Sequence, residues 1–268
     1  MTALHLLVLA ALLSLAMGGA WLYESRTGKS GWVDVTWSAA VGAVGVVAAL
    51  LPSAGAEWWR QALVAVLVAT WSARLVLHLA RRTLRHGVDP RYQALRREWG
   101  EGAELRMFGF LQSQATAGFV LVLAVYVAAR NPAPDLRLQD ILALALFAVA
   151  VAGEAIADHQ MQRFRDDEAN RGKIMDRGLW ALSRHPNYFF EWLGWLAYPL
   201  VAIGIAGGYW QGWLALLAPL LMYYLLVRVS GIPPLEKHME ETRGQAFEDY
   251  KRRVRAFWPI PRAGGDVR

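Results

Sequence analysis

The chain is built from blocks of about twenty consecutive apolar residues that alternate with strongly basic stretches. Each block is long enough to cross ~30 Å of hydrocarbon as a helix, whereas membrane strands would alternate apolar and polar residues one by one. Of the 268 residues, 56% are hydrophobic and only 19% are charged. A soluble domain carries nearer ~25% charged residues. The sequence therefore predicts an all-α fold, a polytopic membrane helix bundle.

We expect about seven transmembrane helices in this bundle. Gly42 and Gly45 lie inside the second of them and are expected at a helix–helix contact. The first span lacks the basic start and the cleavage pattern of a signal peptide, so we expect a retained helix. We see no separate soluble domain and expect a single membrane domain over 1–268, with substrate-side spans in 1–130 and a cofactor-binding part in 139–262. The spans lie near residues 4–22, 33–51, 61–80, 108–129, 139–158, 188–206 and 209–230.

The distribution of Lys and Arg predicts the orientation of the bundle. Loops 23–31, 81–107 and 159–187, together with the segment from residue 231, hold 23 of these residues, while the opposite loops hold three. Because positive charge collects in cytoplasmic loops, the N-terminus is expected outside and the C-terminus in the cytoplasm of a bacterial inner membrane. The net charge of +6 has the same topological cause, so no nucleic-acid partner is expected.

Composition excludes several kinds of site. The chain has no cysteine, which excludes thiolate metal sites, disulfides and cysteine nucleophiles. Its six histidines form no His-x-x-x-His pair, so we expect no metal. A dinucleotide-binding domain of the Rossmann type needs a strand followed by Gly-x-Gly-x-x-Gly, and no such unit is present in the sequence.

One polar stretch, from Asp158 to Trp192, combines Arg, Lys, Asn, His and aromatic residues directly before an apolar span. Pro186 suits the first turn of a helix, and Asn187 and Glu191 are four apart, so they share one helical face. A helix start presents free N–H groups and its positive dipole end, which suits a phosphate. The alternative is a basic loop that orients the chain, followed by an interfacial belt of aromatic residues.

Several polar residues lie inside the apolar spans. Such groups are costly in hydrocarbon and usually face a bundle interior or an aqueous cavity. They also serve as contacts between helices or extend to the membrane surface. Together they indicate a polar cavity that opens to the cytoplasmic side. The residues are Asp34, Arg74, His78, Gln112, Gln114, Glu154 and Asp158.

Motifs of the C-terminal part resemble a known superfamily. They are Asn170-Arg171-Gly172-Lys173, Asp176-x-Gly178-Leu179-Trp180, Ser183-Arg184-His185-Pro186-Asn187-Tyr188 with Glu191, Ser230-Gly231-x-Pro233, Glu236, Tyr250 and Phe257-x-Pro259. In this order they are similar to those of the steroid 5-alpha-reductase-like membrane reductases, which include the sterol reductases and a bacterial group of the same clan. A weaker match lies upstream, at Asp34, Trp37, Arg81, Arg82, Asp89, Arg91, Tyr92 and Trp99.

The resemblance implies NADPH as cofactor, bound from the cytoplasm between the C-terminal helices. Guanidinium groups pair with phosphate, and Asn or Glu can bind an amide or a ribose. The residues that the resemblance places at the cofactor are Arg82, Tyr92, Asp158, Arg165, Asn170, Arg171, Lys173, Leu179, Trp180, Arg184, His185, Asn187, Tyr188, Glu191, Arg228, Glu236 and Tyr250.

Reduction of a C=C bond conjugated to a carbonyl needs a hydride and an acid. The reductases that this chain resembles use an acidic residue and a tyrosine on early spans. Here Leu79 stands where that tyrosine would be expected, next to His78. Asp34 and His78 are therefore the expected catalytic residues.

These features lead to a hypothesis of an NADPH-dependent reductase acting on a steroid-like, prenyl or fatty substrate that enters from the bilayer. The expected partners are that lipophilic substrate and membrane lipids, and the sequence carries no signal of oligomeric state. The alternative is an S-adenosylmethionine-dependent lipid or isoprenylcysteine-type methyltransferase, which shares Arg-His-Pro-x-Tyr and a following Glu. The Asn-Arg-Gly-Lys element and the basic loop 81–107 favour NADPH, because its 2′-phosphate needs cations. A transporter or scaffold would bind no cofactor.

Overall fold

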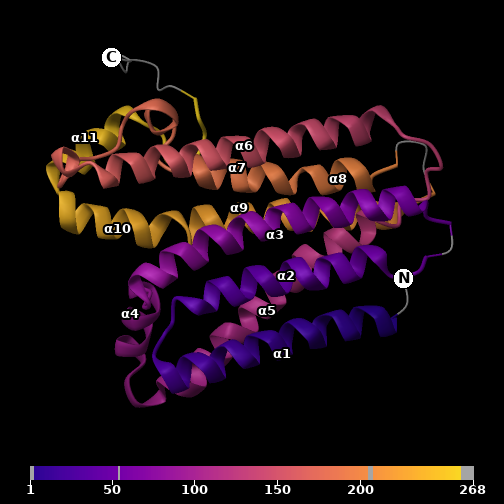
Figure 1. The fold of residues 1–268 in the computed structure, drawn as a ribbon, viewed down its shortest axis with the longest axis horizontal. Coiled ribbons are helices and arrows are strands. Elements are labelled where there is room, and N and C mark those ends of the chain that lie inside the picture. Colours follow the sequence, from indigo (N-terminus) through magenta and orange to yellow (C-terminus); the bar gives the residue numbers. More distant parts are fainter. Residues whose placement is uncertain (1–2, 54, 205–207, 261–268) are drawn as a thin grey trace. The chain divides into compact units, whose positions relative to one another are not determined.

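The computed structural model describes residues 3–53, 55–204 and 208–260, and the regular elements within these ranges are helices (Figure 1). It divides into two compact units, unit 1 (Met1–Arg137 and Tyr198–Ala218) and unit 2 (Leu138–Ala197 and Pro219–Arg268). Unit 1 holds α1 Ala3–Thr27, α2 Trp32–Leu50, α3 Trp58–His86, α4 Pro90–Trp99, η1 Gly100–Gly102, α5 Ala103–Ala128, most of α8 Ala197–Ala202 and η4 Trp210–Leu216. Unit 2 holds α6 Leu138–Asp166, η2 Glu168–Asn170, η3 Gly178–Ala181, α7 Pro186–Trp195, most of α9 Leu217–Tyr224, the π-helical turn η5 Leu225–Val229, α10 Ile232–Arg243 and α11 Gln245–Arg253.

Six helical segments of the described ranges are long and apolar enough to cross a membrane. They are α1, α2, α3, the segment from α4 to α5, α6 and the segment from η4 to α10, so the predicted all-helical membrane fold is confirmed. The remaining predicted span, 188–206, is divided between α7, of ten residues, and α8, of six. Ten helical residues rise ~15 Å, about half of the hydrocarbon core. The sixth of the seven predicted helices is therefore not continuous. The orientation of the bundle stays a prediction.

Close packing of α2 against α3 depends on the two predicted glycines. A Cβ atom on Gly42 would lie 2.0 Å from Oγ of Ser72, and one on Gly45 would lie 2.8 Å from the side chain of Val68. The Ser72 hydroxyl also donates to the carbonyl of Ser38 at 2.9 Å. The expectation that these glycines serve helix packing is confirmed.

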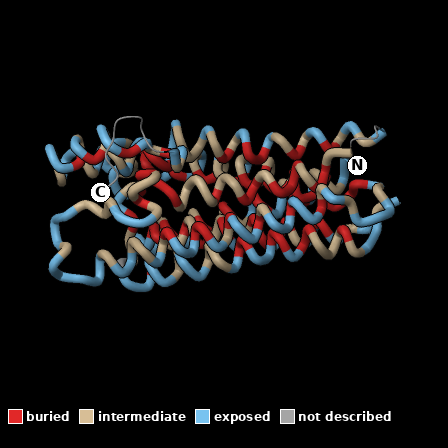
Figure 2. Tube along the Cα trace, turned by 90° about the horizontal axis from the view of Figure 1, so that it is seen from above, coloured by how far each residue is buried: buried red, intermediate tan, exposed pale blue. Residues whose placement is uncertain are grey.

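Burial follows the helical repeat (Figure 2). In α1 the buried residues Leu9, Leu13 and Met17 are four apart, and α5 buries Met107 and Leu111 in the same way. Other leucines of α1 are well exposed. α1 therefore has one side for the protein core and an apolar outer side that suits lipid.

Three arginines of unit 1 bind backbone carbonyls, two at helix ends and one in a loop. Arg130 donates at 2.9 and 3.0 Å to carbonyls at the end of α2, and Arg137 donates at 2.6 Å to a carbonyl of α8. Arg60 donates at 3.2 Å to two carbonyls of the loop 133–135. The last carbonyls of a helix lack partners within the helix, and Arg130 and Arg137 satisfy those of α2 and α8. The three basic residues outside the predicted cytoplasmic face thus have a structural role.

Candidate functional site

A buried ion pair joins the start of α7 to α10. The guanidinium of Arg184 binds Glu236 with two hydrogen bonds, from Nε at 2.8 Å and from Nη2 at 2.9 Å. Nε2 of His185 lies 3.1 Å from the same carboxylate. Arg184 and His185 are both buried, and the contacts with this carboxylate offset the cost of removing the two side chains from water. The motif residues Arg184 and His185 and the distant Glu236 are therefore neighbours.

The segment after α11 runs beside the same motif. The Ser183 hydroxyl donates to the carbonyls of Ala256 and Phe257 at 3.1 and 2.9 Å. The backbone N–H groups of residues 184 and 185 donate to carbonyls of residues 255 and 256, which makes a short parallel bridge. Nη1 of Arg184 donates to the carbonyl of Val254 at 2.6 Å. The Ser-Arg-His part of the motif thus holds the C-terminal segment against the start of α7.

Tyr250 of α11 completes this group. Its hydroxyl donates to the backbone carbonyl of Trp180 at 2.5 Å, and the indole N–H of Trp180 donates to the carbonyl of Ala157 at 3.0 Å. Burial raises the pKa of Tyr250, so its hydroxyl stays protonated and can donate. Trp180, Arg184, His185, Glu236 and Tyr250 are called the C-terminal cluster below.

His185 is neutral in this cluster. Burial lowers the pKa of its imidazole, and the charge of Arg184 lowers it further, although the hydrogen bond to Glu236 acts in the opposite direction. The imidazole also stacks on the ring of Tyr188, with 5.6 Å between the ring centroids and 9° between the planes. The side chain is therefore a fixed, uncharged part of the scaffold at neutral pH.

Aromatic rings extend the contact between α7 and the C-terminal segment. The ring centroid of Trp192 lies 5.3 Å from that of Trp258 and 5.7 Å from that of Phe257. The ring centroids of Phe189 and Phe257 are also 5.7 Å apart. Tyr223 of α9 lies 5.3 Å from Phe257. Edge-to-face ring pairs of this kind stabilise a core beyond the area they bury. Phe189 and Trp192 therefore pack within unit 2.

That polar face consists of Asn187 and Glu191, and α7 begins at Pro186 as predicted. Glu191 is buried, and its Oε1 accepts a hydrogen bond from the indole N–H of Trp195 at 3.2 Å. Asn187 is half-buried one turn earlier, and its side chain makes no hydrogen bond within the described ranges. Asn187 is therefore the residue of this face that has its hydrogen-bonding groups available for a ligand.

The other expected cofactor residues of unit 2 lie outside the C-terminal cluster. The Asn170 amide donates to the carbonyl of Phe164 and to Asp167, both at 3.2 Å, so it stabilises the turn after α6. Asp158 is half-buried, Leu179 lines an apolar groove, and four cations are exposed. Three of these cations form no side-chain hydrogen bond or ion pair with the described part of the chain. The exposed cations are Arg165, Arg171, Lys173 and Arg228. Those without a side-chain partner among the described residues are Arg171, Lys173 and Arg228.

A second polar group lies in unit 1 around Asp34 of α2. The Tyr92 hydroxyl of α4 donates to Oδ1 of Asp34 at 2.7 Å and accepts from the Gln114 amide of α5 at 3.0 Å. Arg91 binds Oδ2 of Asp34 and also Asp89, the latter at 2.8 Å. Tyr92 is almost fully buried, whereas the Asp34 side chain is 22% exposed. The result is a phenol fixed between a carboxylate and an amide.

Charges around this phenol balance one another. Arg82 donates to Asp89 at 3.0 Å and lies 3.8 Å from Asp34. Burial would raise the pKa of Asp89, but the hydrogen bonds and charge of Arg91 outweigh it, so this pKa is lowered and Asp89 is ionised. Asp34, Arg82, Asp89, Arg91, Tyr92 and Gln114 are called the Asp34 cluster below.

The Asp34 cluster rearranges the expected assignments. Arg82 and Tyr92 were expected at the cofactor, and the structure groups both with Asp34. His78, the expected catalytic partner of Asp34, has an exposed side chain on α3. Tyr92 and Asp34 are 58 positions apart and on different helices, so no local spacing in the sequence could have paired them. The only signal was that Asp34, Asp89, Arg91 and Tyr92 occur together in the upstream match.

Fold and sites together define an all-helical, multi-pass membrane protein with the Asp34 cluster in unit 1 and the C-terminal cluster in unit 2. The profile of the family described as "Protein of unknown function (DUF1295)" matches residues 20–254, and the chain belongs to this family. The matched range contains both the Asp34 cluster and the C-terminal cluster. Comparisons with curated proteins and with solved structures found no match.

Proposed function

We propose that the chain is an NADPH-dependent reductase of a bacterial inner membrane, similar to the steroid 5-alpha-reductases, which saturates a C=C bond conjugated to a carbonyl in a lipophilic substrate. The observation that supports this most is the hydrogen bond between Tyr92 and Asp34. The chemistry needs an acid beside the substrate, and this pair supplies a phenol next to a carboxylate. In this proposal Tyr92 of α4 takes the role of the tyrosine that was expected at the position of Leu79.

The proton-donating role falls to Tyr92. Asp34 accepts the hydrogen bond of the Tyr92 hydroxyl and pairs with Arg91 and Arg82, so it orients the phenol, and Tyr92 carries the proton of this contact. When the phenol gives its proton to the substrate, the Gln114 amide still donates to the phenolic oxygen at 3.0 Å and stabilises the charge that develops there. His78 remains the second candidate for the acid.

Exposed cations and one amide of unit 2 suit NADPH. Arg171, Lys173 and Arg228 have no side-chain partner among the described residues, so their charges are available to the phosphates, and Asn187 offers an amide for the carboxamide or a ribose. Bound NADPH supplies the hydride that, with one proton, saturates the double bond. Arg184 contributes indirectly, since Glu236 and a backbone carbonyl occupy its donors.

The donors of Arg184 are bound to Glu236 and to a backbone carbonyl, which weakens the case for a direct contact with a phosphate. This observation favours the alternative function, a methyltransferase. An S-adenosylmethionine-dependent methyltransferase would need no cation for a 2′-phosphate. The buried Arg184–Glu236 pair would then serve only to hold the C-terminal segment.

Nucleotide binding to the protein in lipid nanodiscs separates the two proposals. We expect NADPH to bind at least tenfold more tightly than NADH, about 1.4 kcal/mol. Lys173→Gln should reduce this preference, and Lys29→Gln, which removes an exposed cation from unit 1, should not. Equal affinity for the two nucleotides, or tight binding of S-adenosylmethionine alone, would exclude the reductase.

A further inference from the structure

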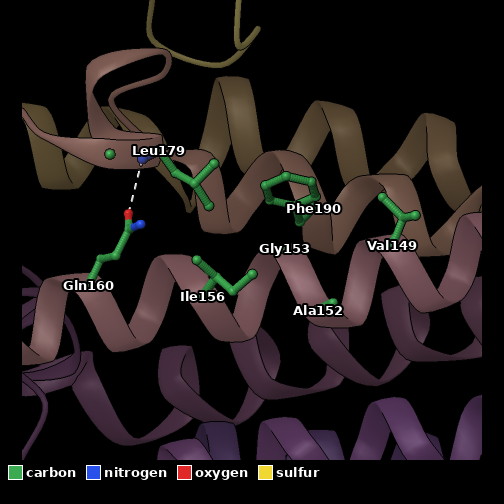
Figure 3. Close-up of a pocket in the computed structure, with 8 residues that line it drawn as sticks. Val149, Ala152, Gly153, Ile156, Gln160, Leu179 and Phe190 are labelled. Atoms are coloured by element: carbon green, nitrogen blue, oxygen red, sulfur yellow. Dashed lines mark hydrogen bonds between the residues drawn. The ribbon is translucent and has the colours of Figure 1, made fainter.

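An apolar groove runs along α6 within unit 2 (Figure 3). Side chains of Val149 and Ile156 from α6 and of Leu179 and Phe190 from the opposite wall point into the same space. Its volume is about 430 Å³, within the usual range of ~300 to 1,000 Å³ for ligand pockets. The full lining is Val149, Ala152, Gly153, Ile156, Gln160, Gly178, Leu179 and Phe190.

Two glycines shape the groove. A Cβ atom on Gly153 would lie 2.4 to 2.6 Å from the ring of Phe190, so only a glycine lets this ring lie against α6. Gly178 has a φ of +59°, and a Cβ atom there would lie 2.7 Å from the amide of Gln160. The Gln160 Oε1 accepts a hydrogen bond from the Leu179 N–H at 3.0 Å, which closes the polar end of the groove.

The groove has the length of a hydrocarbon chain in one leaflet. From Val149 to Gln160 the helix rises ~16 Å, about half of the ~30 Å hydrocarbon core. α6 is one of the candidate membrane spans, and Val149 and Ile156 are 56% and 50% exposed. Apart from Gln160, which is bound to the Leu179 backbone, the lining is apolar. A chain of methylene groups therefore fits this lining better than a polar ligand does.

Positive charge lies at the polar end. Arg163 follows Gln160 by one turn of α6, and Arg177 directly precedes Gly178. Both side chains are exposed and form no hydrogen bond or ion pair within the described ranges. A lipid chain in the groove would bring its headgroup to these two cations. We propose that the groove binds one acyl chain of an anionic phospholipid, with Arg163 and Arg177 at its phosphate. This lipid site does not depend on the proposed reductase chemistry.

Native mass spectrometry of the protein released from detergent micelles tests the site. With dipalmitoyl phosphatidylglycerol we expect one bound lipid per chain, held at least tenfold more tightly than phosphatidylcholine with the same chains. Ala152→Trp fills the groove and should weaken binding at least tenfold. Ala155→Trp is the matched control, because Ala155 is exposed on the same helix but does not line the groove. The double change Arg163→Gln with Arg177→Gln should abolish the preference for the anionic lipid.

Two further arms use the parent protein, so they do not depend on the folding of a variant. Glycerol phosphate without chains should not displace the lipid, and dihexanoyl phosphatidylglycerol should bind at least tenfold more weakly than the dipalmitoyl form. Displacement by glycerol phosphate would overturn the proposal in favour of a free phosphate site. Equal retention of lipid by the Ala152 and Ala155 variants would overturn it as well. NADPH binding measured on the same samples distinguishes this outcome from failure of the reductase proposal, since Ala152→Trp should leave nucleotide affinity unchanged.

Discussion

Replacing Tyr92 by Phe tests the proposed acid with the smallest change in shape. The ring is 3% exposed and lies 6.2 Å from the ring of Phe110, so the variant keeps the packing. It loses a hydrogen bond to the charged Asp34, about 1.5 to 3 kcal/mol, and one from Gln114, about 1 kcal/mol. We therefore expect the free energy of unfolding to fall by about 2.5 to 4 kcal/mol. Loss of a general acid lowers turnover by about 10² to 10⁴-fold.

The assay follows the oxidation of NADPH by the nanodisc-embedded protein with a panel of lipophilic enones. Tyr92→Phe should lower turnover at least about 100-fold, or about 2.7 kcal/mol in activation free energy, while NADPH affinity is kept. Tyr23→Phe is the control, since Tyr23 is exposed on α1. If Tyr92→Phe turns over like the parent and His78→Ala does not, the acid is His78 and the reasoning from the Asp34 cluster is refuted.

Four further outcomes follow from the same contacts. Glu236→Gln leaves the buried Arg184 without its charge partner and should lower the free energy of unfolding by about 3 kcal/mol. The control Glu240→Gln, on the same helix and in a surface pair with Lys251, should lower it by at most about 1 kcal/mol. Equal losses in thermal unfolding would contradict the structure. Asn187→Ala should abolish NADPH binding with little change in Tm, and Trp192→Ala should lower Tm first; the reverse order would show that Asn187 does not contact the nucleotide. Burial lowers the pKa of His185 beside Arg184 and Glu236, so below about pH 6.5 the unfolded chain takes up a proton that the folded chain does not. The Tm should therefore fall between pH 7 and 5.5, and it should fall less in His185→Gln. A C-terminal tag should be accessible only from the cytoplasm, and labelling from outside would reverse the predicted orientation.

Much of the fold could be predicted because the bilayer imposes it. Apolar blocks of sufficient length had to be helices, since a lipid-exposed backbone must satisfy its own hydrogen bonds. Gly42 and Gly45 could be identified as packing positions for the same reason. The division of 188–206 into α7 and α8 could not, because apolar composition sets the length available and not where the helix stops near Leu196. Nor does hydropathy reveal that 198–218 groups with the first unit.

More could be predicted about which residues lie in the two clusters than about how these residues contact one another. Arg184, Glu236 and Tyr250 were all expected near the cofactor, yet the sequence did not indicate that Glu236 would bind Arg184, 52 positions away. The same limit hid the pairing of Tyr92 with Asp34. Contacts between helices depend on rotation and depth of each helix, which no local spacing specifies. The motifs could therefore point to these residues without showing which contacts each one makes.

This arrangement decides which variants can test where the proposed NADPH binds. Arg184 bonds through Nε, Nη1 and Nη2 to Glu236 and to the carbonyl of Val254, so its removal would loosen α10 and the C-terminal segment together. Loss of NADPH binding in an Arg184 variant would then follow from either a missing ligand or a missing scaffold. Lys173 is exposed and has no side-chain partner among the described residues, so Lys173→Gln has no scaffold to lose. A drop in NADPH affinity at unchanged Tm in that variant would place the phosphate beside the loop after η2.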